Sequence, residues 1–227
     1  MESLTGFLKR NFKVACFDMD GTLIQGTTSN LFFAKLLNVE KEVIELEQRL
    51  KEGEVDSDTF MIVISEIMDK LTVDYIMESF DLLPIVDGIH ETLQFLRNAN
   101  IVPIIVTTSN IIFAECFKER YGFERVFGTI HEVSLDGCIG MGKTVCSSKH
   151  KIQHVRELVQ SLGGTMSQVM AIGDSFSDLP LFSEVGCSIA FNYDEVLEGK
   201  ADIYVKSNNI FSIIDGLCQK YGIERNC

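Results

Sequence analysis

Short apolar runs alternate with segments of helical periodicity over most of the chain. The runs contain few polar side chains, which is typical of buried strands. We expect strands at residues 14–17, 101–106, 169–172 and 187–191, with a weaker one at 203–205. Between them, apolar residues recur at helical spacing, as Ile89, Leu93 and Leu96 do. This alternation predicts an α/β fold with a mainly parallel, doubly wound (Rossmann-like) sheet.

Residues 25–87 interrupt this alternation. Their apolar residues predict four successive helices, with N-cap candidates at Thr28 to Asn30 and at Asp56 or Ser57. A segment of this length is too long to be a loop of a compact domain. We therefore predict an α/β core formed by residues 1–24 and 88–227, with a helical cap, residues 25–87, inserted after the first strand.

A hairpin is expected in the second half of the core. Residues 126–133 have the pattern of an edge strand, and Asp136-Gly137 is a dipeptide typical of hairpin turns. The next helix begins at Ser147 or Ser148 and carries Lys149 in its first turn.

Polar residues follow three of the predicted strands directly. The first strand is followed by Asp18 and Asp20, the second by Thr107, and the third by Gly173, Asp174 and Asp178. Such residues are common in turns. In parallel α/β sheets, however, ligands bind beyond the carboxyl ends of the strands. Three polar strand ends on one sheet edge therefore predict a functional site.

The charge of the chain limits its partners. The formal net charge is -13 and the sequence pI is about 4.7. Such a chain repels nucleic acid and anionic membranes, so neither is an expected partner. An anionic substrate would need a metal ion or a lysine at the site. No apolar run approaches the length of a membrane span.

The seven cysteines include no C-x-x-C pair. We expect these cysteines to be buried reduced thiols rather than disulfides or zinc ligands. Residues 1–10 lack the apolar core and the cleavage site of a signal peptide. We therefore expect a cytoplasmic protein.

Four motifs in order resemble those of the haloacid dehalogenase superfamily of phosphotransferases, and most closely its phosphoserine-phosphatase-like branch. They are a strand before D-x-D-G-T (Asp18 to Thr22), a strand before Thr107, Lys149 near the start of a helix, and a strand before G-D-x-x-x-D (Gly173 to Asp178). The resemblance covers nearly the whole chain. It also implies that the insert between the first two motifs is a cap.

The resemblance implies a phosphatase that transfers the phosphoryl group of a small phosphomonoester to Asp18 and then to water. Asp20 would act as general acid and then as base. A Mg²⁺ ion would be held by Asp18, the backbone carbonyl of Asp20 and Asp174. The phosphate would be bound by Lys149 and by Thr107 or Thr108, with Gly173 and Asp178 supporting the site.

Several assignments stay open at this point. Lys143 and Lys151 are alternatives to Lys149, and Thr108 or Ser109 replaces Thr107 if the strand ends later. A phosphoserine phosphatase proper and a phosphomutase are the alternative enzymes. A regulatory or binding protein that accepts phosphate on the same fold is the alternative of another class. The sequence does not distinguish a monomer from a homodimer.

Phosphoserine itself is not the expected best substrate. Phosphoserine phosphatases of the family carry a Glu soon after the first motif, where this chain has Gln25 to Thr28. They also carry a cap Arg, and residues 60–68 contain no Arg or Lys. Arg49, with Glu45 or Glu47, is the alternative that could replace these two residues.

Overall fold

A seven-stranded sheet forms the centre of the computed structural model, which describes residues 3–68 and 70–223. The strand order is β4-β3-β2-β1-β5-β6-β7, and every neighbouring pair is parallel except β3 and β4. The strands are β1 (Val14–Phe17), β2 (Val102–Asn110), β3 (Arg125–Val133), β4 (Ile139–Thr144), β5 (Val169–Gly173), β6 (Cys187–Phe191) and β7 (Ile203–Val205). The predicted mainly parallel α/β fold is confirmed.

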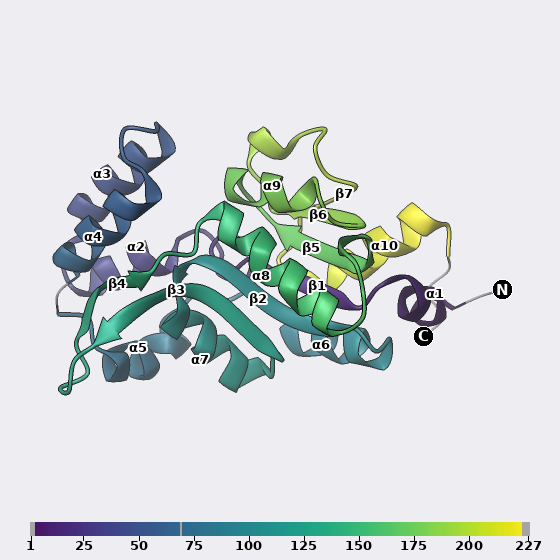
Figure 1. Cartoon of the computed structure of the whole chain (residues 1–227), viewed down its shortest axis with the longest axis horizontal. Coiled ribbons are helices and arrows are strands. Elements are labelled where there is room, and N and C mark those ends of the chain that lie inside the picture. Colours follow the sequence, from purple (N-terminus) through teal and green to yellow (C-terminus); the bar gives the residue numbers. More distant parts are fainter. Residues whose placement is uncertain (1–2, 69, 224–227) are drawn as a thin grey trace.

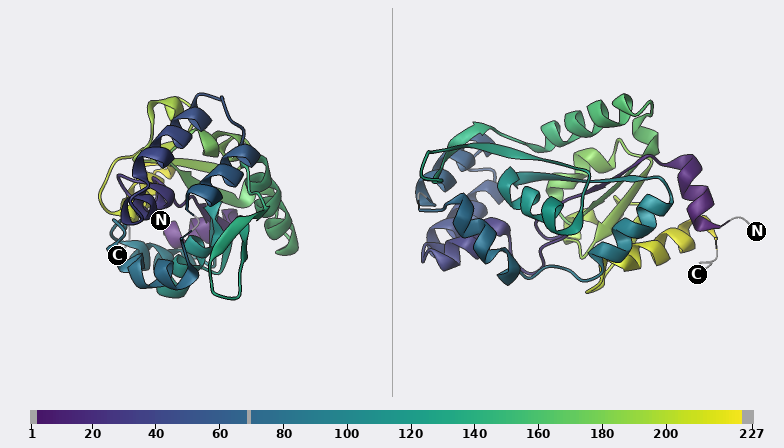
Figure 2. Two further views of the ribbon diagram at one scale, coloured as in Figure 1. Left: turned by 90° about the vertical axis from the view of Figure 1, so that its left-hand side faces the viewer. Right: turned by 90° about the horizontal axis from the view of Figure 1, so that it is seen from below.

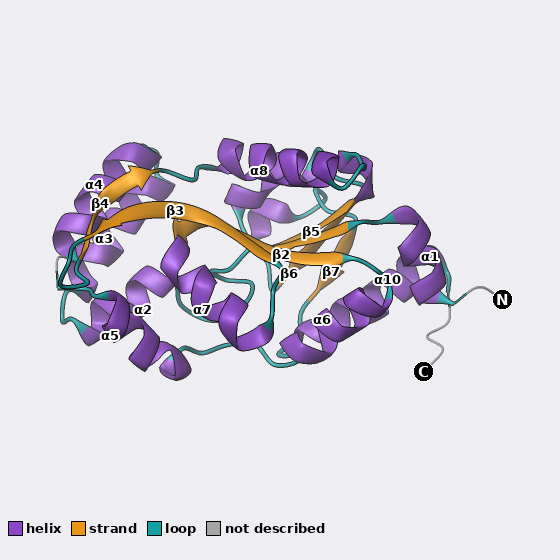
Figure 3. Cartoon of the chain, turned by 60° about the horizontal axis from the view of Figure 1, so that its bottom comes forward, coloured by secondary structure: helices purple, strands orange, loops and turns teal. Residues whose placement is uncertain are grey.

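Helices cover both faces of the sheet because alternate residues of its buried strands point to opposite faces. Val14 and Cys16 of β1 belong to one hydrophobic cluster, and Ala15 and Phe17 belong to the other. The first cluster includes residues of α8 (Ser148–Ser161) and α9 (Leu179–Phe182). The second includes residues of α1 (Leu4–Asn11), α6 (Ile89–Asn98), α7 (Ile111–Tyr121) and α10 (Ile213–Tyr221). Figure 3 shows the sheet between α8 on one side and α6, α7 and α10 on the other.

The described residues between β1 and α6 form four α-helices, as the pattern predicts. They are α2 (Ser29–Leu36), α3 (Glu40–Lys51), α4 (Ser57–Ile67) and α5 (Val73–Ser79). They lie with the β3–β4 hairpin at the end of the molecule opposite α1 and α10 (Figures 1 and 2). The Ile139 N–H donates to the Leu71 carbonyl (2.9 Å), and Phe33 stacks on Phe113 of α7 at 5.1 Å between ring centroids. The helices are thus fixed to the hairpin and to α7, while the division into core and cap stays a prediction.

Capping residues explain several helix ends. The Asp56 side chain accepts from the Thr59 N–H (2.7 Å) before α4, and the Asn110 side chain accepts from the Ile112 N–H (3.0 Å) before α7. Gly122 ends α7 with a φ of 83°, which a glycine adopts without strain. In the part of the chain that the structure describes, five short 3₁₀ helices complete the elements: Phe80–Leu82, Met166–Gln168, Phe176–Asp178, Glu195–Leu197 and Ile210–Ser212.

Three elements differ from the sequence prediction. β2 continues to Asn110, because its polar end stays paired with β3 through Asn110 and Thr129. The hairpin's second strand, β4, pairs with β3, so β4 is the edge strand and β3 is not. Helix α1 was not expected.

The remaining global predictions concern membranes and thiols. Within the described ranges, no helix has both the length and the apolar character needed to cross a membrane. No disulfide joins the six cysteines that the structure describes.

Candidate active site

A cavity of about 580 Å³ opens at the carboxyl ends of β1, β2 and β5. Its lining includes five predicted site residues: Asp18, Asp20, Thr107, Thr108 and Asp174. Helices α2, α3 and α4 of the insert supply much of the remaining lining. Strand ends that are far apart in the sequence therefore meet at one cavity, as the polar strand ends predict.

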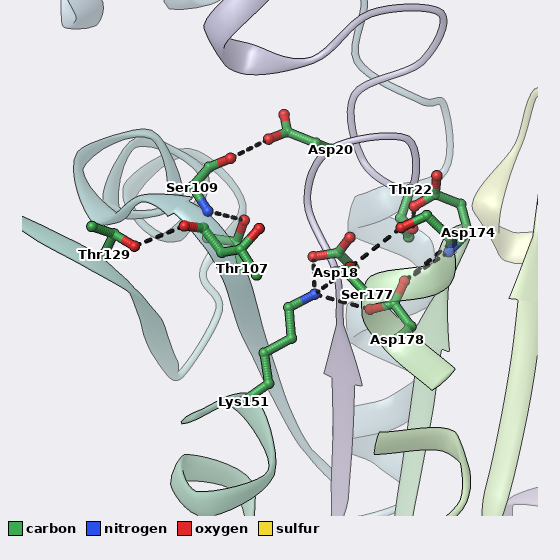
Figure 4. A network of polar contacts seen from close by, with 12 residues as sticks. Asp18, Asp20, Thr22, Thr107, Ser109, Thr129, Lys151, Asp174, Ser177 and Asp178 are labelled. Atoms are coloured by element: carbon green, nitrogen blue, oxygen red, sulfur yellow. Dashed lines mark hydrogen bonds and ion pairs between the residues drawn. The ribbon is translucent and has the colours of Figure 1, made fainter. Parts of the chain in front are cut away.

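Asp18 lies next to a buried lysine. The Lys151 Nζ is 2.8 Å from Asp18 Oδ1 and 2.9 Å from Asp178 Oδ1, and it donates to Ser177 Oγ at 3.3 Å (Figure 4). The side chains of Lys151 and Asp18 are only 1% and 6% exposed. This ammonium group is therefore held between two buried carboxylates.

The structure places Lys151, and not the predicted Lys149, beside Asp18. Lys149 is exposed, whereas Lys151 comes from the first turns of α8 and reaches Asp18. Two residues correspond to a rotation of about 200° around a helix, so the two side chains leave α8 on opposite sides. Lys151 shares its side with the buried Val155 and Leu158. Lys143, the other alternative, is also exposed.

Burial dominates the electrostatics of the cluster. It raises the pKa of Asp18 to about 7, with the charge of Asp178 raising that pKa further and Lys151 opposing both. Burial, with the charges of Asp18 and Asp178, raises the pKa of Asp174 well above its usual range. Burial alone would lower the pKa of Lys151, but Asp178 and Asp18 outweigh it and raise that pKa above the ordinary lysine value. Three acids therefore share one buried cation.

The Asp20 side chain points away from this cluster (Figure 4). Its Oδ1 accepts from the Ser29 N–H (2.6 Å), and its Oδ2 accepts from the hydroxyls of Ser29 (3.0 Å) and Ser109 (2.5 Å). Burial raises the pKa of Asp20, and these hydrogen bonds oppose the shift. Sequence reasoning missed both serines as partners of Asp20. Their position at the start of α2 and at the end of β2 was the available signal.

Asp178 fixes the turn after β5. Its Oδ2 accepts from the backbone N–H groups of Asp174 (3.1 Å) and Ser175 (3.3 Å). A Cβ on Gly173 would lie 2.4 Å from the Asp178 Cγ, so the residue before this turn has to be glycine. The predicted G-D-x-x-x-D motif is thus a tightly packed turn that sets the position of Asp174.

Gly21 allows the turn after β1 to approach Asp174. Its φ is 81°, and a Cβ there would lie 2.0 Å from Asp174 Oδ2. The next residue, Thr22, donates its hydroxyl to Asp174 Oδ1 (3.2 Å). The first and fourth motifs are therefore in direct contact.

The acidic cluster fits a divalent cation. Carboxylate oxygens of Asp18, Asp174 and Asp178 all lie within 4.8 Å of one another. Asp178 is already engaged by Lys151 and by two backbone N–H groups, which leaves Asp18 and Asp174 as the freer oxygen ligands. Oxygen ligands of this kind suit Mg²⁺. The Asp20 carboxylate is not part of this group. A contribution of the Asp20 backbone carbonyl to the metal site stays a prediction.

The two threonines of β2 differ in their surroundings. Thr107 is buried, and its hydroxyl accepts from the Ser109 N–H (3.1 Å). Thr108 is half-buried, and its carbonyl accepts from the Thr129 hydroxyl (2.7 Å). Both line the cavity, so the choice between them as phosphate ligand stays open.

Known proteins resemble this chain over most of its length. The model of the haloacid dehalogenase-like hydrolase family matches residues 12–186. Phosphoserine phosphatase of Campylobacter jejuni subsp. doylei is 26% identical over 203 residues, covering 89% of this chain and 98% of the relative. Phosphoserine phosphatase of Archaeoglobus fulgidus is 25% identical over 205 residues, which cover 90% of this chain and 59% of the relative. The chain thus spans little more than half the length of that enzyme.

Solved structures share the fold. A phospho-aspartyl intermediate analogue of phosphoserine phosphatase superposes with a TM-score of 0.78 at 23% identity, covering 90% of this chain and 98% of that one. A substrate-bound phosphoserine phosphatase complex gives a TM-score of 0.79 at 22% identity, with coverages of 90% and 97%.

The chain belongs to the haloacid dehalogenase-like hydrolase family. Within that family it is similar to phosphoserine phosphatases. That family is one of hydrolases, and the curated relatives named above are phosphatases, the phosphoric monoester hydrolases.

Proposed function

We propose that this chain is a Mg²⁺-dependent phosphatase that hydrolyses a small phosphomonoester through an aspartyl phosphate on Asp18. The observation that carries the proposal is the Asp18 carboxylate, which lines the cavity 2.8 Å from the buried Lys151 ammonium. The solved structure of a phospho-aspartyl intermediate analogue, which shares the fold, supports the same chemistry.

The proposed reaction has two steps. An Asp18 oxygen attacks phosphorus, the bond from phosphorus to the alcohol oxygen breaks, and Asp20 gives its proton to the leaving oxygen. A water molecule then gives a proton to Asp20 and attacks phosphorus, which releases phosphate and restores Asp18. Positioned acid–base catalysis of this kind contributes about 10²–10⁴ in rate. Ser29 and Ser109 hold the Asp20 carboxyl in place for both proton transfers.

Positive charge has to separate the anionic nucleophile from the anionic phosphate. Mg²⁺ held by Asp18, Asp174 and the backbone carbonyl of Asp20 would supply one such charge when bound. Lys151 supplies another, and Asp178 and Ser177 set its position. Hydroxyl and backbone N–H groups at the end of β2, including Thr107 and Thr108, would donate to the phosphate oxygens.

Multiple turnover of p-nitrophenyl phosphate that requires Mg²⁺ is the expected result. Excess chelator should abolish it, and added Mg²⁺ should restore it. Ca²⁺ should inhibit, because it takes more ligands at longer distances and would occupy both oxygens of Asp18. Undiminished turnover in chelator would contradict the metal assignment. A single stoichiometric release of p-nitrophenol without turnover would favour the phosphate-accepting regulatory protein.

Phosphoserine phosphatase proper is the second candidate, because the curated relatives carry that name. The cavity lining argues for another substrate. Residues 26–28, Phe60 and Met61 line it without an acid or a base among them. Arg49 is exposed and pairs with Glu54 (3.4 Å), so it does not replace the missing arginine. Glu47, the other residue of the alternative pair, does line the cavity.

Phosphoserine is therefore expected to be a poor substrate. Hydrogen bonds to charged groups contribute about 1.5–3 kcal/mol each. Without an arginine to bind the substrate carboxylate, the preference for phosphoserine over other phosphomonoesters should fall by at least about tenfold. The measurement is kcat/KM over a panel of phosphoserine, sugar phosphates, nucleotides and cofactor phosphates. A hundredfold or greater preference for phosphoserine would restore the phosphoserine phosphatase assignment.

A small phosphorylated metabolite is the proposed partner. The net charge of -13 disfavours binding to nucleic acid. A cytoplasmic location stays a prediction from the cysteine content.

A further inference from the structure

Glu47 brings a carboxylate from the insert into the cavity. It comes from α3, is half-buried and lines the same cavity as Asp18. Its Oε1 accepts from the Thr28 hydroxyl (2.8 Å), and no other described side chain or N–H group donates to this carboxylate. Most of its hydrogen-bonding capacity therefore faces the cavity without a protein partner.

Glu47 is joined to the catalytic centre by two consecutive residues. Thr28 donates to Glu47, and the next residue, Ser29, donates to Asp20 through both its N–H and its hydroxyl. The Thr28 hydroxyl also accepts from the Leu31 N–H (3.1 Å), which fixes it at the start of α2. A group bound at Glu47 is thereby held in a fixed relation to the acid that protonates the leaving oxygen.

The surroundings of Glu47 favour a cation as its missing partner. Burial raises the pKa of Glu47 to about 7, the Thr28 hydrogen bond opposes that shift, and the charge of Asp20 adds to it. A desolvated carboxylate is stabilised most by an opposite charge that also donates hydrogen bonds. Of the described residues that line the cavity, only Lys51 is basic, and its side chain is exposed.

The rest of the cavity fits a carbon chain and, among the described lining residues, offers a second anion only the exposed Lys51. Several apolar side chains line the cavity: Leu31, Ile44, Leu50, Phe60 and Met61. A volume of about 580 Å³ lies within the range of small-molecule sites. A substrate carboxylate would meet no arginine or histidine there, whereas an ammonium would meet Glu47.

We propose that Glu47 is a specificity-determining residue that binds an ammonium group on the alcohol part of the substrate. The substrate class is then the phosphomonoesters of amino alcohols that carry no carboxylate. This inference rests on the proposed phosphatase function and adds the chemistry by which the substrate is selected.

The test compares matched substrates. A series of ω-aminoalkyl phosphates of increasing chain length is assayed against the ω-hydroxyalkyl phosphates of equal length. The wild-type chain is expected to prefer the amino ester of the best length by about tenfold or more in kcat/KM. In Glu47→Gln this ratio falls about tenfold or more, and in Glu47→Asp, which keeps the charge, part of the preference remains. Glu45→Gln on the exposed side of α3 is the control, with the wild-type ratio.

Two results overturn the inference. One is an equal kcat/KM for amino and hydroxy esters at every length in the wild type. The other is a Glu47→Gln variant that loses both esters equally. Calorimetric binding to Asp18→Asn separates this inference from the proposed function. If Asp18→Asn binds amino esters more tightly than hydroxy esters and Asp18→Asn/Glu47→Gln does not, recognition by Glu47 is supported even if the wild type hydrolyses no ester. If Asp18→Asn binds both kinds of ester equally, the inference is overturned.

Discussion

Asp18→Asn is expected to lower kcat by about 10⁴ or more, a loss of the size seen when a catalytic nucleophile is removed. The asparagine amide has nearly the same shape, but it is a far weaker nucleophile and carries no charge for Lys151, 2.8 Å away. No covalent intermediate can then form. Turnover of p-nitrophenyl phosphate in the presence of Mg²⁺ measures the loss.

Asp20→Asn is expected to fail in a different way. It removes the proton donor and the later base, which contribute about 10²–10⁴ in rate. Because p-nitrophenol leaves without a proton, this variant should release a burst of p-nitrophenol equal to the enzyme concentration and then hydrolyse the phosphoenzyme slowly.

Rapid-quench measurements distinguish the two variants, since the burst is absent in Asp18→Asn and present in Asp20→Asn. Asp74→Asn, an exposed acid in the first turn of α5, is the matched control and should turn over at the wild-type rate. Near-normal turnover in Asp18→Asn would refute the assignment of the nucleophile.

The fold was predictable because its signals are local. Each buried strand is a short apolar run, and capping residues such as Asp56 and Asn110 mark the starts of their helices. β4 was harder to recognise, because Ile139–Thr144 contains two glycines and its pairing with β3 depends on residues across the hairpin. β2 is longer than the apolar run that predicted it, because the polar residues at the end of β2 are also paired with β3.

The site was predictable only where a motif ends a strand. Asp18 and Asp174 follow apolar runs directly, so the sheet itself brings them together. The partners of Asp20 are 9 and 89 residues away, so the positions of Ser29 at the start of α2 and Ser109 at the end of β2 were the only signal that they converge on one carboxylate. Lys151 is a different case, since its spacing from Val155 and Leu158 already placed it on the buried side of the helix. Position within the motif favoured Lys149, whereas helical periodicity favoured Lys151.

Lys151→Met is expected to lower both activity and stability. The methionine keeps most of the length and packing of the side chain but leaves the carboxylates of Asp18 and Asp178 buried without their ammonium partner. Removing one member of a buried ion pair costs about 3–5 kcal/mol of unfolding free energy. Loss of a charge that stabilises the transition state lowers kcat by about 10²–10³. Urea unfolding, with kcat measured at saturating substrate, tests both effects.

Lys149→Met is the matched control, two residues earlier on the same helix. Its side chain is exposed, so its unfolding free energy should stay within about 0.5 kcal/mol of the wild type and its kcat within about twofold. Added Mg²⁺ should restore part of the stability of Lys151→Met, because a cation between Asp18 and Asp174 partly replaces the lost charge. A large loss of activity in Lys149→Met, with little change in Lys151→Met, would contradict the assignment of Lys151 and return the phosphate-binding role to the exposed lysine.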